Sequence, residues 1–296
     1  MKAALLVAAL ALTACGSAGS SSTIPGDNGA GPRLRQDLLG RPPAFQLSIA
    51  LFDAPLANIP NVKVNVGLDG VQLLAASGSV PFLTNDKPQV VNLLDLQDHA
   101  LQFNGSAPAG HYTGIRLLVD SANSGVVVGG HTFPIVWGAP GNATTASVVA
   151  VDFACAFDLG SIGTNGPTKI TLDFNVMQSV RFVNATFYVE PSVTAANAAG
   201  QVAGKVLNRA GKPVSNAAVV ALDLSGHTVN STLTKSDGNY VLHALPPGMY
   251  TIAVKNTFVT AGGETITAVN ADPGAAPSQA IVLSPEDELE LGALVD

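Results

Sequence analysis

The chain has 296 residues, of which 47% are hydrophobic and 12% are charged, and its formal net charge is −7. This length fits about two domains of roughly 100–200 residues each. The negative charge and the lack of a basic cluster argue against a nucleic-acid partner, because such proteins neutralise phosphates with lysine and arginine. With so few charges, the surface must rely on Ser, Thr, Asn and Gly for solubility.

The N-terminal segment has the pattern of a bacterial secretion signal. Lys2 supplies a positive charge, and the apolar run at residues 3–12 is too short to span a bilayer. The stretch Leu12-Thr13-Ala14-Cys15-Gly16 then resembles the lipobox of bacterial lipoproteins, in which small residues precede a cysteine that becomes the acylated N-terminus. An ordinary cleaved signal with an incidental cysteine is the alternative.

The lipobox resemblance implies a location. Residues 1–14 would be the removed signal peptide, and acyl chains on Cys15 would anchor the protein to a membrane, since several chains hold stably where one does not. Gly16, where an aspartate would favour the inner membrane, favours the outer membrane, facing the periplasm or the cell surface. Residues 15–44, rich in Gly, Ser and Pro, are predicted to be a flexible tether.

The second cysteine, Cys155, lies in the strand-like run 151–157. If Cys15 is lipidated, Cys155 has no partner for a disulfide. The sequence therefore predicts a buried free thiol that packs as a small hydrophobic side chain. Two cysteines are too few for a disulfide framework or a cysteine-based metal site.

The pattern Pro-x-Gly-x-Tyr-Thr occurs twice, beginning at Pro108 and at Pro246. Proline fixes φ, and the glycine two residues later can take a positive φ, so each stretch predicts a sharp turn into a strand. In β-sandwiches a tyrosine at such a corner often donates its hydroxyl to nearby backbone. The residues that alternate with Tyr250 are apolar, whereas those that alternate with Tyr112 include Arg116. We therefore expect Tyr250 to face a core and Tyr112 to face a more polar surface.

Alternating apolar residues predict about eight strands between residues 45 and 194, with no long helix. The segments that form them are 45–52, 62–66 with its continuation at 70–75, 89–96, 111–119, the hairpin of 126–128 and 131–137, 146–157, 169–174 and 182–193. A small-residue link at 195–200 leads to a second unit with expected strands at 201–207, 217–224, 228–234, 240–245, 249–254 and 280–283. Residues 285–296 are predicted to be a solvated acidic tail. The fold class is all-β, with two β-sandwich domains in tandem.

The second unit, residues 201–284, carries four short motifs in order. They are Ala203-Gly204-Lys205-Val206, Gly211-Lys212-Pro213-Val214-Ser215-Asn216-Ala217, Lys235-Ser236-Asp237-Gly238-Asn239-Tyr240 and Leu245-Pro246-Pro247-Gly248-Met249-Tyr250. Together they resemble the carboxypeptidase regulatory-like domain, a transthyretin-like sandwich. The resemblance implies an accessory module without catalytic residues. Related sandwiches bind starch and other glycans, so the resemblance also implies carbohydrate binding as an alternative.

The first unit, residues 45–194, resembles the DUF4382 family of bacterial lipoproteins. The matching pieces are Phe52-Asp53-Ala54-Pro55, Val91-Asn92-Leu93-Leu94, the run from Pro108 to Leu117, Thr171-Leu172-Asp173-Phe174 and Phe187-Tyr188-Val189-Glu190-Pro191. The family typically has a Lys-Ser pair soon after the Leu-Asp-Phe strand, where this chain has Gln178-Ser179. Because the family's activity is not established, the resemblance implies architecture and location only.

The search for chemistry finds candidates but no catalytic motif. The histidines show no metal-ligand spacing, and no nucleophile elbow or phosphate loop is present. Asp53, Asp173 and Asp237 could supply oxygen ligands to a metal, but such residues more often form turns. Trp137, beside the loop-like 138–142, is the best candidate for stacking on a glycan, and the alternative is that it closes one end of the core. Asn230-Ser231-Thr232 matches the glycosylation pattern, which we interpret as a chance match.

The sequence thus predicts a non-enzymatic lipoprotein of the cell envelope, without cofactor, that acts as a binding or structural module. Its expected partners are the membrane, through Cys15, and envelope glycans or proteins. One alternative is a carbohydrate-binding surface lipoprotein that uses Trp137. Another is an accessory module of an extracellular hydrolase system.

Overall fold

The computed structural model describes residues 44–53, 61–97, 99–160, 167–255, 257–259, 265–267 and 278–295. All of these residues belong to one compact unit, Pro42–Asp296. The predicted signal peptide, Cys15 and the tether up to residue 43 lie outside the described residues. Within the described part, no helix is long and apolar enough to cross a membrane.

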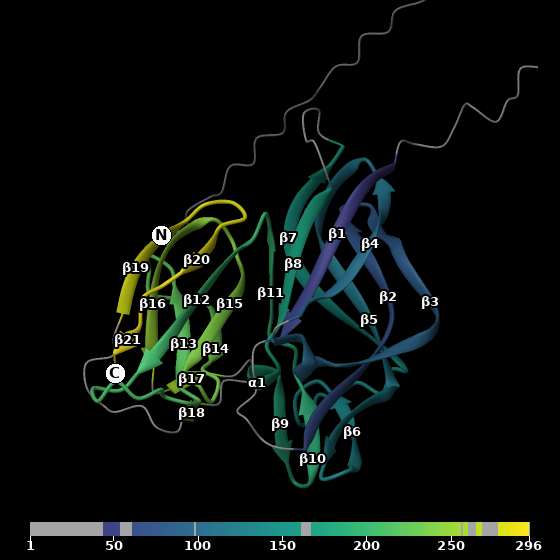
Figure 1. Ribbon diagram of the computed structural model, residues 1–296. Helices are drawn as coiled ribbons and strands as arrows, with labels where there is room; N and C mark the ends of the chain where they lie inside the picture. The colour runs from purple at the N-terminus through teal and green to yellow at the C-terminus, as the bar shows by residue number, and fades with distance from the viewer. Residues whose placement is uncertain are drawn as a thin grey trace, which may run out of the picture. The chain divides into compact units, whose positions relative to one another are not determined.

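The first domain consists of two sheets packed face to face (Figure 1). One sheet has the order β11-β8-β1-β4 and is formed by β11 (Val193–Asn197), β8 (Thr168–Phe174), β1 (Ala44–Asp53) and β4 (Leu101–Pro108). The other sheet has the order β3-β2-β5-β6-β10-β9. Its strands are β3 (Gly78–Asn92), β2 (Val62–Ala75), β5 (Gly110–Val128), β6 (His131–Trp137), β10 (Thr186–Val189) and β9 (Val180–Val183). A seventh strand, β7 (Val148–Leu159), pairs with β5. A 3₁₀ helix, η2 (Leu93–Gln97), and a single helical turn, α1 (Val176–Ser179), complete it.

Strand alternation explains the core of this domain. Along β1, Leu47, Ile49 and Leu51 are buried while the residues between them are partly exposed. These side chains face the second sheet, and each fully buried aliphatic side chain contributes about 1.5–3 kcal/mol. Between β5 and β6, Gly129 and Gly130 both have positive φ, 56° and 85°, which confirms the predicted hairpin turn.

The second domain is a smaller sandwich with its own core. One sheet joins β15 (Asn239–Leu245), β12 (Gly200–Leu207), β20 (Glu288–Glu290) and β21 (Leu294–Val295), and the other has the order β14-β13-β16-β19, from β14 (Thr228–Leu233), β13 (Ala218–Leu222), β16 (Gly248–Lys255) and β19 (Ser278–Leu283). A two-stranded sheet joins β17 (Thr257–Val259) and β18 (Thr265–Thr267). The all-β, two-sandwich prediction is confirmed.

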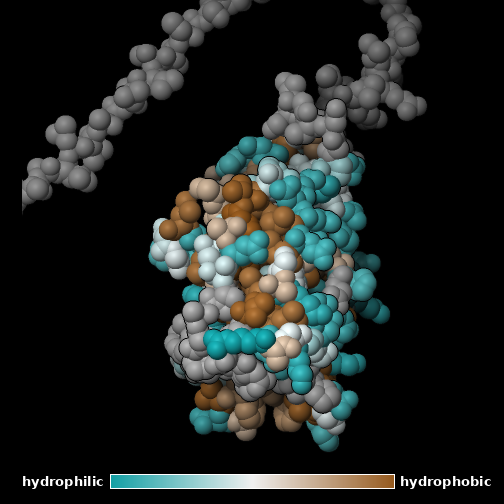
Figure 2. All heavy atoms as spheres, turned by 60° about the vertical axis from the view of Figure 1, so that its left-hand side comes forward, coloured by the Kyte–Doolittle hydropathy of each residue, from teal (hydrophilic) through white to brown (hydrophobic). Residues whose placement is uncertain are grey.

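Figure 2 shows one side of the molecule, on which apolar and hydrophilic residues alternate over the surface. In the second domain, Met249 on β16 and Val282 on β19 are paired neighbours that are 52% and 70% exposed. Their strand neighbours Tyr250 and Ile281 are buried. The outer side of this sheet is therefore more apolar than strand alternation alone requires.

Both predicted tyrosine corners are formed. The Tyr112 hydroxyl donates to the carbonyl oxygen of Pro108 at 2.9 Å, and the Tyr250 hydroxyl donates to that of Pro246 at 2.6 Å. The glycine inside each corner does not have the positive φ that we expected. Each glycine instead lies under its tyrosine ring, because a Cβ on Gly110 would come within 3.8 Å of the Tyr112 ring and one on Gly248 within 3.3 Å of the Tyr250 hydroxyl.

The predicted polar environment of Tyr112 is wrong. Tyr112 is 3% exposed and stacks on Phe157, with ring centroids 5.3 Å apart. The reason is a bulge, because the register between β5 and β7 shifts just after Tyr112 and both Gly114 and Ile115 are buried. The shift lets both Tyr112 and the apolar residues that follow it face the core.

Three predicted segments differ from the structure. The expected strand 182–193 is three strands, because Asn184 and Ala185 both have positive φ and turn β9 into β10. The expected link 195–200 belongs mostly to β11 and β12, which leaves two residues between the domains. The acidic tail at 285–296 is not simply solvated, because β20 and β21 pair in parallel with β12 and bury Leu291 and Leu294.

Candidate functional site

The most elaborate polar arrangement in the described chain lies where the two sandwiches meet. Asn230 of β14 donates through Nδ2 to Asp173 Oδ2 at 2.8 Å and to the carbonyl oxygen of His243 at 2.7 Å. Asn175 donates through Nδ2 to the carbonyl oxygen and the Oγ of Ser231 at 3.0 and 3.1 Å. Gln178 Nε2 donates to the same Oγ at 2.7 Å. We call these five residues, Asp173, Asn175, Gln178, Asn230 and Ser231, the latch.

The single turn α1 positions the side of the latch that belongs to the first domain. Asn175 caps this turn by accepting from the Gln178 backbone N–H at 3.0 Å, and Asp53 accepts from the Val176 N–H at 3.0 Å. Ser192 Oγ donates to Gln178 Oε1 at 2.8 Å and fixes that amide. The helical turn thus holds two amide side chains toward Ser231.

Burial changes the electrostatics at the end of β8. Asp173 is 3% exposed, and burial raises its pKa to about 7, although the hydrogen bond from Asn230 opposes the rise. Burial also raises the pKa of Asp53 well above its usual range, against the effect of the Val176 N–H and together with repulsion from Asp173. One oxygen of each carboxyl, Asp53 Oδ2 and Asp173 Oδ1, has no hydrogen-bond partner among the described residues.

The two buried carboxyls do not form a metal site. Asp53 is paired opposite Phe174 and shares the core-facing side of the sheet, whereas Asp173 is paired opposite Phe52 on the side that faces the second domain. Among the described residues, no group of three or more His, Cys, Asp and Glu side chains converges. Asp237 has the turn role, since its Oδ1 accepts from the Asn239 backbone N–H at 3.0 Å.

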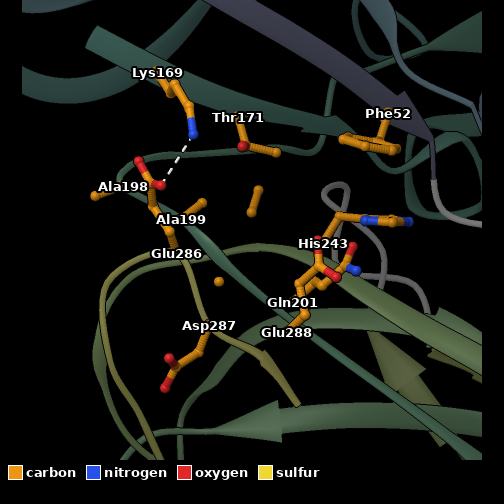
Figure 3. A pocket seen from close by; sticks show the side chains of 12 residues that line it. Phe52, Lys169, Thr171, Ala198, Ala199, Gln201, His243, Glu286, Asp287 and Glu288 are labelled. Atoms are coloured by element: carbon orange, nitrogen blue, oxygen red, sulfur yellow. Dashed lines mark hydrogen bonds and ion pairs between the residues drawn. The ribbon is translucent and has the colours of Figure 1, made fainter. Parts of the chain in front are cut away.

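A small pocket of about 290 Å³ lies beside the latch (Figure 3). On one side, Lys169 Nζ and Glu286 Oε2 are 3.0 Å apart in an exposed ion pair, which contributes little to stability. On the other side, the rings of Phe52 and His243 stack in parallel with centroids 3.9 Å apart. His243 Nε2 also lies 3.4 Å from the carbonyl oxygen of Gln97. The pocket is acidic and its lysine is already paired.

The remaining predicted residues have different outcomes. Trp137 does not present a stacking face, because it is 2% exposed and packs in the core at the end of β6. That correction follows from strand alternation, which places Trp137 on the same side of β6 as Ile135. Cys155 is a buried free cysteine, as predicted, and burial raises the pKa of its thiol. Cys15 lies outside the described residues.

The structure shows a different group of surface aromatic residues. Phe133 and Phe182 are 38% and 62% exposed, and both contact Phe187, with centroid distances of 5.8 and 4.7 Å. These three rings come from β6, β9 and β10. They lie on the same side of the sheet as the core residue Ile135, with which Phe187 is paired. Sequence reasoning missed them because the expected strand 182–193 hid the β9–β10 turn. It also missed the latch, whose only local signal is the cap formed by Asn175 and Gln178.

The fold and the joint define a two-domain all-β protein without a recognisable catalytic cluster among the described residues. Comparison with known families gives the same two domains in the same order. Residues 45–191 match the domain of unknown function (DUF4382), and residues 201–284 match the carboxypeptidase regulatory-like domain. Each sandwich of the described chain thus corresponds to one of the two matched domains. Among curated proteins, none matches this chain.

Solved structures with similarity to this chain are distant. A 9R-lipoxygenase from Cyanothece PCC8801 is 12% identical with a TM-score of 0.23, and the match covers 33% of this chain and 16% of the lipoxygenase. The minor pilin GBS52 from Streptococcus agalactiae is 12% identical with a TM-score of 0.26, covering 85% and 96%. The shaft pilin SpaA from Lactobacillus rhamnosus GG is 6% identical with a TM-score of 0.24, covering 86% and 97%. At these scores the matches say nothing about function.

Proposed function

We propose that this chain is a lipid-anchored, non-enzymatic module of the cell envelope, in which the latch joins the two domains into one rigid body. The observation that carries the proposal is how the polar groups at the joint are used. Asn175, Asn230 and Ser231 are all buried, and their hydrogen bonds run from one domain to the other. Buried polar groups of this kind cost free energy unless they are paired, so they favour one fixed arrangement of the domains.

The short connection supports the same proposal. Only Ala198 and Ala199 lie between β11 and β12, and Ala198 has a φ of 49°. A connection of this length gives the domains little freedom to separate. Two contacts across the joint then meet at His243. Its ring stacks on Phe52, and its carbonyl oxygen accepts a hydrogen bond from Asn230.

Substituting Asn230 tests the rigid body. In an Asn230→Ala variant, Asp173 loses its only hydrogen-bond donor among the described residues and the joint loosens. We expect the two domains to unfold in a single step in urea in the parent chain and in two separate steps in the variant. An Asn142→Ala variant, changed in an exposed loop, is the control and keeps a single step. A single unchanged step in Asn230→Ala would refute the latch.

The membrane anchor needs a separate test. Cys15→Ser should move the protein from the membrane fraction to the soluble fraction of cells, because no acyl chain can then be attached. Cys155→Ser is the matched control, since it removes the other cysteine and should leave the protein with the membrane. If Cys15→Ser remains with the membrane, the anchor is elsewhere.

Carbohydrate binding is a second candidate function, and the Phe133, Phe182 and Phe187 group favours it. The exposed rings of Phe133 and Phe182, on either side of the partly buried Phe187, offer an apolar surface on which a polysaccharide chain can stack. A glycan array with the full chain should show binding that Phe182→Ala abolishes. Leu224→Ala is the control, because Leu224 is 78% exposed but isolated from this group. Binding that survives Phe182→Ala would exclude this surface.

A further inference from the structure

A second groove runs along the latch and is larger than the pocket in Figure 3. Its volume is about 550 Å³, within the range of roughly 300–1,000 Å³ that small-molecule sites occupy. Residues 192–194 and α1 of the first domain line one side, and β13, β14 and β16 of the second domain line the other. Joints between domains are a preferred place for such sites.

The floor of the groove comes from the outer face of the sheet β14-β13-β16. Across this sheet Ser231 is paired with Val220, and Val220 with Ala253, so these three residues share one face. Lys255 lies two residues beyond Ala253 on the same strand and therefore on the same face. The small side chain of Ala253 leaves the lysine stem free to lie along the groove.

The groove combines three kinds of surface. Val193, Val220 and Val229 supply apolar walls. The amide and hydroxyl groups of the latch form a neutral polar edge, and Thr194 and Thr228 add hydroxyl groups that make no hydrogen bond with another described residue. This mixture suits a ligand with several hydroxyl groups, because neutral amides and hydroxyls both donate and accept hydrogen bonds.

The charge in the groove is what distinguishes it. Lys255 makes no ion pair or hydrogen bond with any residue in the described part of the chain. In the pocket of Figure 3, by contrast, Lys169 is paired with Glu286 at 3.0 Å, and the carboxylates of Asp287 and Glu288 line the same pocket. On a chain with a net charge of −7, an ammonium group that no described residue neutralises favours an anionic group on a ligand in the groove.

We infer that this groove binds a small hydroxylated carboxylate of the sugar-acid class, with Lys255 pairing the carboxylate and Thr194 and Thr228 bonding the hydroxyl groups. Lys255 is the specificity-determining residue, and the valines contact the apolar face of the sugar ring. This site goes beyond the proposed envelope module. It does not depend on Cys15 or on the exposed phenylalanines.

The test is calorimetric titration of the detergent-solubilised full chain with three probes. Sodium D-glucuronate carries both the carboxylate and the hydroxyl groups, D-glucose carries only hydroxyl groups, and acetate carries only the charge. We expect glucuronate to bind and each of the other two to bind at least about tenfold more weakly, because a hydrogen bond to a charged group is worth more than a neutral one. Lys255→Gln should weaken glucuronate binding by about tenfold or more.

Lys212→Gln is the matched control, because it removes the same charge from an exposed turn of the same domain and should leave binding unchanged. Thr228→Val should weaken glucuronate binding by about threefold, the loss of one neutral hydrogen bond. The inference is overturned if glucuronate does not bind, if glucose binds as tightly as glucuronate, or if Lys255→Gln binds glucuronate like the parent chain. A Cys15→Ser chain that leaves the membrane but still binds glucuronate keeps this result separate from the anchor.

Discussion

The two domains share the tyrosine corner, but they differ in the polar groups that they bury. Tyr112 and Tyr250 each donate a hydrogen bond to the carbonyl oxygen of the proline four residues earlier. At the joint, however, the first domain contributes the buried carboxyl of Asp173, whereas the second contributes the neutral groups of Asn230 and Ser231. The comparison teaches that the corners stabilise each sandwich by itself, while the buried carboxyl of the latch belongs to the first domain.

The largest expected effect concerns pH. A carboxyl whose pKa is raised by folding destabilises the folded state once it is ionised, so stability is highest at low pH and falls as pH rises. For Asp173 the fall runs from its ordinary pKa of 3.8 to about 7 and can reach about 4 kcal/mol, at about 1.4 kcal/mol for each pH unit. In Asp173→Asn the fall should be smaller, with Asp53 as the remaining source. Urea unfolding at several pH values between 4 and 8 measures it, and an unchanged slope would contradict the role of Asp173.

A second prediction concerns the bulge that follows the first corner. A Cβ on Gly114 would collide with the carbonyl oxygen of Phe153, so Gly114→Ala should destabilise the chain by about 3 kcal/mol. Gly129→Ala is a useful contrast, since its Cβ would meet no atom within 4 Å and only its positive φ opposes the change. Thermal unfolding compares the two. If Gly114→Ala is tolerated as well as Gly129→Ala, the bulge does not set the direction of the strand.

The third prediction tests whether the corners are equal. Tyr112→Phe and Tyr250→Phe each remove one hydroxyl and one hydrogen bond, so each should cost about 1 kcal/mol in the free energy of unfolding. Tyr188→Phe serves as the control, because no hydrogen bond from the Tyr188 hydroxyl is found within the described chain. Clearly unequal losses at Tyr112 and Tyr250 would show that the shared hydrogen bond has a different value in the two domains.

The smallest expected effect separates the two corner glycines. A Cβ on Gly248 would lie 3.3 Å from the Tyr250 hydroxyl, whereas one on Gly110 would lie no closer than 3.8 Å to Tyr112. Gly248→Ala should therefore be less stable than Gly110→Ala, by a margin below about 1 kcal/mol. Denaturation of both variants under the same conditions measures the difference. The reverse order would mean that the backbone of the corner, and not the ring above it, selects glycine.

Local features were the ones that the sequence could predict. The tyrosine corners and the Gly129-Gly130 hairpin depend on residues within a few positions of each other, and both are confirmed. The side to which Tyr112 points could not be read, because the bulge depends on pairing with β7, more than 40 residues away along the chain. Residues 286–290 were predicted to be a tail because of their acidic composition. Their parallel pairing with β12 involves residues far away along the chain, so the local sequence does not indicate it.

The joint was beyond prediction for a related reason. Asn230 and Asp173 are 57 positions apart, and neither has a local pattern that points to the other. Asp53 and Asp173 could be named as candidates because carboxylates within strands are unusual, but only the strand register shows that they face opposite sides of the sheet. For Trp137 the glycine-rich loop after it suggested an exposed stacking site, but the alternation within β6 places the ring in the core, which was the alternative that the sequence left open.

The position of β1 has a mechanical consequence. β1 begins at Ala44, where the N-terminal segment joins the fold, and it lies between β4 and β8 with eight residue pairs to the first and seven to the second. A pull on Ala44 along the strand axis loads both ladders in shear, so their hydrogen bonds must break together and not one after another. The hydrogen bonds of β1 to β4 and β8 would therefore resist a force on the N-terminus before that force reaches the latch.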